Sequence, residues 1–235
     1  MVETLSFPHI HSPKISEVTY DLIKDKIASK EFAPGTRLNL DAIEKQLGVS
    51  RTPLKQAMDR LALEGLIQIL PRSGTFVSNP SPEEISESFE VRCVLEVYAV
   101  GLAAQWIREE ELENLKNLLK ELRELTEEQD LSAIYPRYLK IDHLFHYQIT
   151  VISGNNRLLQ AFERENVHAQ MARIRYRHPE GELDLVQKEH ERILAALIAH
   201  DPETACKAME AHLQRARRSL MEDIEKDLHK LKKTV

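Results

Sequence analysis

Four side chains in the second half of the chain have residue types and spacing that suit a metal site. Asp142 and His146 stand four residues apart, so on a helix both side chains leave the same face. His190 precedes Asp201 by 11 residues and His212 follows it by 11, and Asp201 begins an Asp-Pro pair typical of a chain reversal. Antiparallel helices joined there would carry both imidazoles at the same height. Three imidazole nitrogens and one carboxylate oxygen suit Zn²⁺, Ni²⁺ or a similar divalent ion.

The same histidines have a simpler explanation, which their spacing alone does not exclude. The chain holds 10 His, and a histidine in the middle of a helix is more often a core or surface residue than a ligand. The spacing of Asp142 and His146 is a weak signal by itself, and the matched height of the other two histidines is what favours a metal. His143 would point about 100° away from Asp142 around the helix, so we do not count it as a ligand.

An ion with an open coordination position attracts oxyanions, and arginines can pair with carboxylates through two hydrogen bonds. Arg92 is the first candidate for holding such an anion, because it lies among apolar residues where an unpaired charge would be costly. The alternative is an ion pair between Arg92 and Glu96, four residues on. Asn155 follows a glycine at an expected helix end, where it is either a turn residue or a ligand contact. The weaker arginine candidates are Arg137, Arg173 and Arg175.

These candidates lie in the second of two parts that differ in charge. The segment over residues 78–82 holds two prolines among small polar residues, which stops any preceding helix or strand. Residues 1–79 carry 10 Lys+Arg and 9 Asp+Glu, whereas residues 80–235 carry 22 and 29. We therefore expect one domain over residues 1–79, with residues 1–13 as a flexible tail, and a second domain over residues 80–235.

The first part has the element order of a winged helix-turn-helix. Hydrophobic periodicity predicts helices over residues 15–27, 40–47 and 51–64, followed by a hairpin built from residues 66–70 and 75–77. Gly48 is expected to end the second helix in a left-handed conformation, and Ser50 to cap the third. Such a tight turn sets the third helix at a steep angle, which lets it enter a major groove.

The start of that third helix carries groups that suit DNA. Arg51 and Lys55 lie on one face with Thr52 beside them, and their cationic groups suit phosphate oxygens and guanine edges. Arg72 lies at the expected tip of the hairpin, where a wing residue would reach a neighbouring groove. A solvated basic face is the competing interpretation, and the hairpin directly after the third helix favours DNA.

The second part reads as an antiparallel all-helical bundle, because the expected helices are joined by short loops. The whole chain is therefore expected to be mainly α, with a winged helix-turn-helix followed by this bundle. The expected helices cover residues 83–108, 109–129, 134–153, 158–177, 183–199 and 202–231.

Composition and sequence pattern indicate the cellular location of the protein. Two Cys do not make a disulfide framework, no apolar run approaches the ~20 residues that span a bilayer, and the first residues lack the pattern of a signal peptide. We therefore expect a cytoplasmic protein without a membrane partner. The formal net charge of −6 argues against a surface that binds polyanions everywhere, but not against a local DNA-binding face.

Residues 34–77, PGTRLNLDAIEKQLGVSRTPLKQAMDRLALEGLIQILPRSGTFV, resemble the DNA-binding domain of the GntR family of bacterial transcription regulators. The resemblance implies that operator DNA is contacted by Arg51, Thr52, Lys55, Arg72 and Gly74. Two positions depart from the family pattern. Lys55 stands where the family usually has arginine, and it cannot make arginine's two-pronged contact. Asp41 stands where many members have an arginine, which puts the usual contact from the second helix in doubt.

Residues from about 84 to 220 look like the ligand-binding domain of the FadR subgroup of that family. The phrases that carry this resemblance are FEVRCVLEVYAVGLAA, DHLFHYQITVISGNN and KEHERILAALIAHDPETACKAMEAHL. In many members an Asp and three His at these positions bind a divalent metal, and they correspond here to Asp142, His146, His190 and His212. The resemblance also implies a homodimer and a small carboxylate effector beside the metal, with zinc the first expectation and nickel the second.

The expected function is a DNA-binding regulator, a repressor in most such proteins, whose affinity for a palindromic operator responds to a small organic acid. Two alternatives remain open at this point. The ion itself could be the effector, which would make the protein a metal sensor. A metal-dependent hydrolase is the weaker alternative, because no general base, nucleophile motif or phosphate-binding loop accompanies the ligands.

Overall fold

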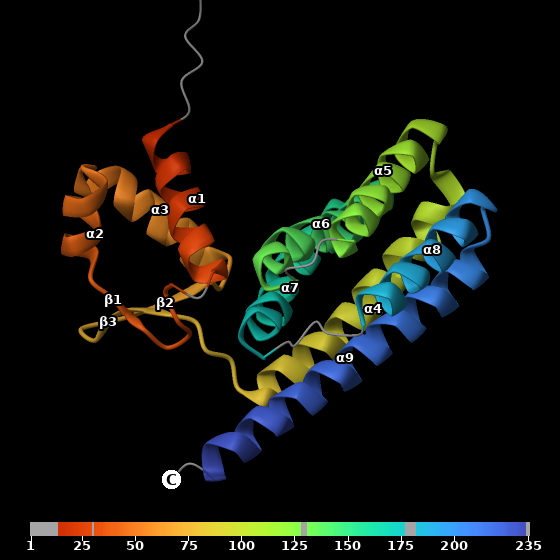
Figure 1. The fold of residues 1–235 in the computed structure, drawn as a ribbon. Coiled ribbons are helices and arrows are strands. Elements are labelled where there is room, and N and C mark those ends of the chain that lie inside the picture. The colour runs from red at the N-terminus through yellow and green to blue at the C-terminus, as the bar shows by residue number, and fades with distance from the viewer. Residues whose placement is uncertain (1–13, 30, 128–130, 177–181, 234–235) are drawn as a thin grey trace, which may run out of the picture.

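The computed structural model describes residues 14–29, 31–127, 131–176 and 182–233. It is mainly α-helical, with a small sheet in its N-terminal part and a helical bundle in its C-terminal part (Figure 1). The fold class expected from the sequence is therefore confirmed. The expected tail over residues 1–13 lies outside the described residues, as does the expected loop over residues 178–181.

The N-terminal part is a three-helix unit with a wing. In its sheet β3 lies between β1 and β2, both antiparallel to it, with Arg37 opposite Phe76 and Ile67 opposite Val77. The first strand was not predicted, because two residues are too few to show an alternating pattern. The elements are α1 (Ile15–Ala28), β1 (Arg37–Leu38), α2 (Leu40–Leu47), α3 (Arg51–Leu63), β2 (Ile67–Leu70) and β3 (Gly74–Val77).

The turn between α2 and α3 depends on local chemistry at its ends. Asn39 caps α2, since its side-chain oxygen accepts a hydrogen bond of 3.1 Å from the Ala42 N–H. Gly48 follows α2 with φ of +64°, a left-handed conformation that costs glycine little. Ser50 occupies the N-cap of α3, but its side chain makes no capping hydrogen bond, so that part of the expectation was wrong. Behind the turn, the buried core includes Ile23, Ile27, Leu54, Met58, Leu61, Ile67 and Val77.

The C-terminal part is a bundle in which the long helices α4 and α9 lie side by side (Figure 1). A capping box between Ser81 and Glu84 begins α4 directly after the wing. The described helices are α4 (Pro82–Trp106), α5 (Glu109–Thr126), α6 (Leu131–Ile152), α7 (Asn156–Tyr176), α8 (Leu183–Ile198) and α9 (Pro202–Lys233).

The core of the bundle surrounds the middle of α6. Phe145 is fully buried there, and its ring centroid lies 4.8 Å from that of His190 on α8. Leucines from α5, such as Leu115 and Leu122, pack into the same apolar cluster. The histidine side chains singled out by the sequence therefore lie inside the bundle rather than on its surface. Within the described residues, no helix is both long enough and apolar enough to cross a membrane.

Candidate metal centre and DNA-reading surface

Three histidines from three helices meet in the bundle core. His146 comes from α6, His190 from α8 and His212 from α9, and all three are buried. The His190 ring centroid lies 4.7 Å from that of His212 and 5.3 Å from that of His146, and the remaining pair is 5.1 Å apart. One ring nitrogen from each lies within 4.8 Å of the others, which is the clustering that a shared cation requires.

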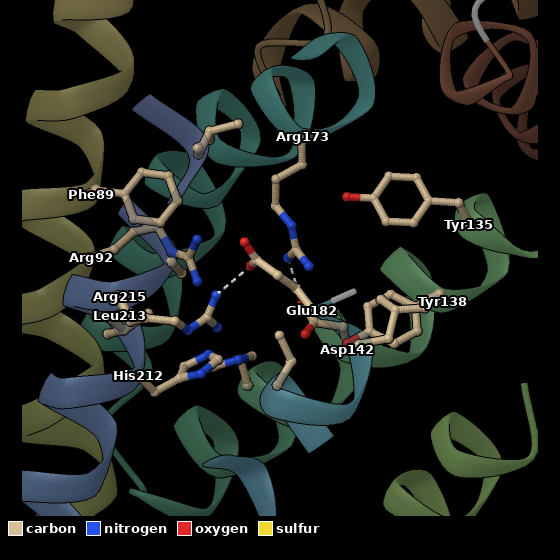
Figure 2. A pocket seen from close by; sticks show the side chains of 15 residues that line it. Phe89, Arg92, Tyr135, Tyr138, Asp142, Arg173, Glu182, His212, Leu213 and Arg215 are labelled. Atoms are coloured by element: carbon tan, nitrogen blue, oxygen red, sulfur yellow. Dashed lines mark hydrogen bonds and ion pairs between the residues drawn. The ribbon is translucent and has the colours of Figure 1, made fainter. Parts of the chain in front are cut away.

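Asp142 adds an oxygen at the edge of this cluster. Its Oδ2 accepts a hydrogen bond of 2.5 Å from Nη1 of Arg173 (Figure 2). Its Oδ1 lies 3.6 Å from Nε2 of His190. Burial opposes ionisation of this carboxyl, but Arg173 and then His190 hold the pKa of Asp142 well below its ordinary value. The carboxylate is therefore ionised and already held in place, with one oxygen directed at the histidines.

Two glutamates contact the outer nitrogens of two histidines. Oε2 of Glu96 lies 2.6 Å from Nδ1 of His146, and Oε2 of Glu189 lies 2.8 Å from Nδ1 of His212. Carboxylates in this position commonly fix the tautomer of a metal-binding histidine and direct its other nitrogen toward the ion. Although burial raises it, the charges of Arg92 and His146 lower the pKa of Glu96 to about 2.

His190 is the least satisfied of the three rings. Among the described residues, neither of its ring nitrogens has a hydrogen-bond partner, and its side chain is 0% exposed. Burial, and then the nearby His212, lower the pKa of His190 well below its ordinary value. Burial also lowers the pKa of His212, against the opposing effect of Glu189. Neutral imidazoles with available lone pairs are the form that ligates a cation. This donor set therefore fits a divalent ion.

A small cavity opens beside the histidines, with a volume of about 40 Å³. Its wall combines apolar side chains such as Phe89 and Leu213 with the guanidinium groups of Arg92, Arg173 and Arg215 (Figure 2). A single water needs roughly 10–15 Å³ by this measure, so the cavity admits a ligand of only a few heavy atoms.

The arginines of the cavity already have partners within the chain. Nε of Arg92 donates a hydrogen bond of 2.7 Å to Glu96, which is the ion pair weighed as an alternative from the sequence. Arg173 pairs with Asp142, and Arg215 pairs with both Glu182 and Glu189. A ligand carboxylate would therefore share these guanidinium groups with the protein's own carboxylates.

Other residues proposed from the sequence for the effector lie elsewhere. Arg137 is exposed and its Nη2 pairs with Glu121 at 2.7 Å, so it does not line this cavity. Asn155 is also exposed, and its side-chain oxygen accepts the Arg157 and Leu158 N–H groups at 3.1 Å. It therefore caps α7, which is the turn role considered for it. The side chain of Arg175 lies outside what the structure describes.

Sequence reasoning missed the residues behind the histidines. Glu189 was not among the candidates, yet its carboxylate reaches across to His212 and Arg215 on α9. Arg215 stands three residues after His212, a spacing that puts both on one face of α9 and could have signalled it. Glu96 stands four residues after Arg92, a spacing that indicated their pairing but not the contact of Glu96 with His146.

The DNA-reading candidates lie on the surface of the N-terminal part. Arg51, Thr52 and Lys55 are exposed on the first turns of α3, and Arg72 is exposed in the turn between β2 and β3. Gly74 begins β3 with φ of +119°. L side chains rarely adopt this backbone conformation, so glycine is favoured there, whereas the nearby Arg37 side chain, 2.9 Å from a Cβ built at Gly74, is flexible enough to move. The exposure of Arg51, Thr52, Lys55 and Arg72 leaves them available as candidates for DNA contact.

Arg51 is paired with two acidic residues of α2. Its Nη1 lies 2.5 Å from Oδ1 of Asp41 and 3.2 Å from Oε2 of Glu44. The hydrogen bond to Asp41, and then that to Glu44, raise the pKa of Arg51. Asp41 is one of the positions where the sequence departs from its family. The structure places its carboxylate against Arg51, the first residue of α3, which is the expected recognition helix.

Replacing Arg51 by alanine should weaken specific operator binding by roughly 5- to 150-fold, the value of one good bidentate base contact. The measurement is fluorescence anisotropy with labelled operator at several salt concentrations. A base contact lowers affinity for the operator more than for unrelated DNA, whereas a phosphate contact lowers both and reduces the salt slope by about one. Unchanged affinity would remove Arg51 from the interface.

Replacing Asp41 by alanine should have the opposite effect, because it releases Arg51 from an exposed ion pair. Such pairs are worth at most about 1 kcal/mol, so the gain in affinity for any duplex should stay below roughly 5-fold. The same anisotropy titration measures it, with Glu31→Ala as a control, since Glu31 forms an exposed ion pair with Lys26 rather than with Arg51. Weaker binding by Asp41→Ala would instead mean that Asp41 orients Arg51 for its contact.

A helix-turn-helix with a wing, joined to a helical bundle with a buried polar site, defines the class of DNA-binding transcription regulators. Residues 15–77 match the family model described as "Bacterial regulatory proteins, gntR family", and residues 87–215 match that of the FCD domain. The chain therefore belongs to the GntR family, in the group with an FCD domain at the C-terminal side. This confirms the family that the sequence resembles.

Relatives cover most of the chain. The Nta operon transcriptional regulator of Aminobacter aminovorans is 32% identical over 80% of this chain and 85% of its own length. The transcriptional repressor RspR of Escherichia coli is 27% identical over 85% of this chain and 86% of its own length. The solved structure of E. coli McbR/YncC shares the fold with a TM-score of 0.76, at 24% identity over 91% of this chain and all of the other.

These comparisons establish the general function. The chain is a DNA-binding transcription regulator with an effector-type FCD domain, and it is not an enzyme, as expected. The hydrolase considered from the sequence is therefore set aside.

Proposed function

We propose that this regulator is a homodimeric, cytoplasmic repressor whose FCD domain binds one divalent ion and one small carboxylate, which together set its affinity for a palindromic operator. The observation that carries the proposal is the buried cluster of His146, His190 and His212 with Asp142 at its edge. His190 is fully buried and its ring nitrogens have no hydrogen-bond partner among the described residues, which is costly unless a ligand satisfies them, and a cation does so.

The donor set favours a late divalent metal, with zinc first and nickel second. His146, His190, His212 and Asp142 would hold the ion, which when bound supplies a Lewis-acidic position for a carboxylate oxygen. The cavity beside it restricts the effector to a few heavy atoms. Within it, the hydroxyl of Tyr138 has no hydrogen-bond partner among the described residues, so it can bind a polar group of the acid.

An effector can change operator binding only if it binds two arrangements of the protein with different affinity. A coupling free energy of about 1–3 kcal/mol would change operator affinity by roughly 5- to 150-fold. In a homodimer, the relevant arrangements are the spacings of the two recognition helices, because a palindromic site fixes the distance between its half-sites.

The test begins with elemental analysis of gently purified protein by plasma mass spectrometry, alongside native mass spectrometry. One divalent ion per chain and a dimer mass support the proposal, and a small additional mass identifies the bound acid. Anisotropy titrations of operator follow, for the metal-free protein, for the zinc-loaded protein, and for the zinc-loaded protein with a panel of short organic acids.

The outcomes separate the candidate effectors. If operator affinity changes only when an acid is added to the zinc-loaded protein, the carboxylate is the effector. If it follows free zinc without any acid, the ion is the effector and the protein is a metal sensor. If the protein holds no ion after gentle purification and binds no added zinc or nickel, the proposed metal site is wrong.

A further inference from the structure

Two similar chains of contacts lie behind the histidine cluster. In the first, Arg92 donates to Glu96, and Glu96 contacts Nδ1 of His146. In the second, Arg215 donates to Glu189, and Glu189 contacts Nδ1 of His212. Each chain therefore runs from an arginine through a carboxylate to the outer nitrogen of a proposed ligand. The first chain is the more deeply buried, since Glu96 is 1% exposed and Glu189 is 12% exposed, and the two carboxylates also lie on different helices.

The two carboxylates belong to helices in different positions along the chain. Glu96 is on α4, which begins at Pro82, shortly after the wing strand β3 ends at Val77. Glu189 is on α8, which lies between α7 and α9 along the chain rather than next to the wing. The segment before α4 is held by that part, because Ser78 is buried and its N–H donates to the Leu66 carbonyl at 3.0 Å.

Glu96 has little freedom to move without disturbing its helix. It is 1% exposed, its Oε1 is bound by Arg92 on the same helix, and its Oε2 contacts His146 on α6. A histidine whose inner nitrogen is coordinated becomes a stronger donor at its outer N–H, so it holds a carboxylate partner more tightly. Coordination of His146 therefore changes the force with which α6 holds α4 at Glu96.

We propose that Glu96 is the positioning residue through which occupancy of the three-histidine site acts on α4 and so on the DNA-binding part. The inference depends on the metal site of the proposed function, and it adds a route by which that site regulates DNA binding. Glu189 makes the same contact from α8, so it supports the affinity of the site for the ion without transmitting its occupancy.

The test compares Glu96→Gln with Glu189→Gln in the full-length protein. Zinc affinity is measured by competition with a chromogenic chelator, and operator affinity by anisotropy without zinc and at saturating zinc. Both variants should lose roughly 10- to 100-fold in zinc affinity, as removal of a partner behind a ligating histidine does. At saturating zinc, only Glu96→Gln should lose the zinc-dependent change in operator affinity, whereas Glu189→Gln should keep the wild-type change.

A second variant covers the case in which Glu96→Gln does not fold. Glu96→Asp keeps the negative charge for Arg92 but shortens the reach toward His146, so it should fold and show the same loss of coupling. Nitrogen-15 spectra of the zinc-loaded proteins add a local readout. The outer N–H signal of His146 should be present in the wild type and Glu189→Gln, and shifted in both Glu96 variants.

Several results would overturn the inference. One is a full zinc-dependent change in operator affinity in folded Glu96→Gln or Glu96→Asp, and another is an equal loss in Glu189→Gln. Wild-type protein that binds zinc with no effect on operator affinity, with or without an acid, overturns this inference and leaves the metal site standing. Wild-type protein that binds no divalent ion overturns the metal site and this inference together.

Discussion

Replacement of Arg92 by alanine should lower the free energy of unfolding of the bundle by about 3–5 kcal/mol. The side chains of Arg92 and Glu96 are 4% and 1% exposed, so the variant leaves an ionised carboxylate buried with only His146 beside it. The cost arises mainly from that uncompensated charge rather than from the lost attraction. Urea denaturation followed by circular dichroism measures it, because the bundle contributes most of the helical signal.

The control for this prediction is Arg217→Ala, which breaks an exposed ion pair between α9 and α4. Arg217 pairs with Glu90 at 2.5 Å, but their side chains are 38% and 61% exposed, so the loss should be about 0–1 kcal/mol. Equal destabilisation by the two variants would show that burial of Arg92 carries no special cost. A double variant, Arg92→Met with Glu96→Leu, should recover much of the stability, because apolar replacement of a buried pair is often neutral.

That double variant separates stability from regulation. It removes both charges from the contact with His146 while keeping α4 packed, so the bundle should fold and yet show no zinc-dependent change in operator affinity. A stable double variant with a normal response would mean that packing of α4, rather than the Glu96 contact, connects the site to the DNA-binding part.

The parts of this structure that the sequence predicts are those governed by local periodicity. The spacing of Asp142 and His146 places them on one face because a helix turns once in 3.6 residues. The chain reversal at Asp201 brings His190 and His212 together because each lies 11 residues from it, and so the same number of helical turns away. The recognition helix follows in the same way from Gly48, whose left-handed conformation ends α2.

The parts that the sequence does not predict depend on how helices are rotated against one another. The Glu189 side chain is long enough to cross from α8 to His212 on α9. A periodic sequence pattern predicts which face of a helix a residue is on, but not such a contact between two helices. Arg137 is on the same helix as Asp142 but pairs with Glu121 on the outside of the bundle, so its charge alone was no guide to the cavity. The strand β1 is defined by its pairing with β3 rather than by its own two residues.

The second prediction with a large expected effect concerns His190, one of the three clustered histidines. Replacing His190 by alanine should lower zinc affinity by more than the ~100-fold that loss of an outer partner causes. The reason is that the change removes a proposed ligand itself rather than a partner behind one, since His190 is 0% exposed and neither of its ring nitrogens has a hydrogen-bond partner among the described residues. Zinc-loaded wild-type protein should melt at a higher temperature than metal-free protein, and this stabilisation should vanish in the variant.

The matched control is His229→Ala, because His229 is exposed on α9 and remote from the cluster in sequence and environment. It should retain the wild-type zinc stoichiometry and the zinc-induced stabilisation. Metal-free His190→Ala should still bind operator like the metal-free wild type, because Arg51 and its neighbours are on the N-terminal part, whose apolar core is a separate cluster from that of the bundle. Stoichiometric zinc retained by His190→Ala would show that the ion binds elsewhere, and the proposed site at the three buried histidines would be wrong.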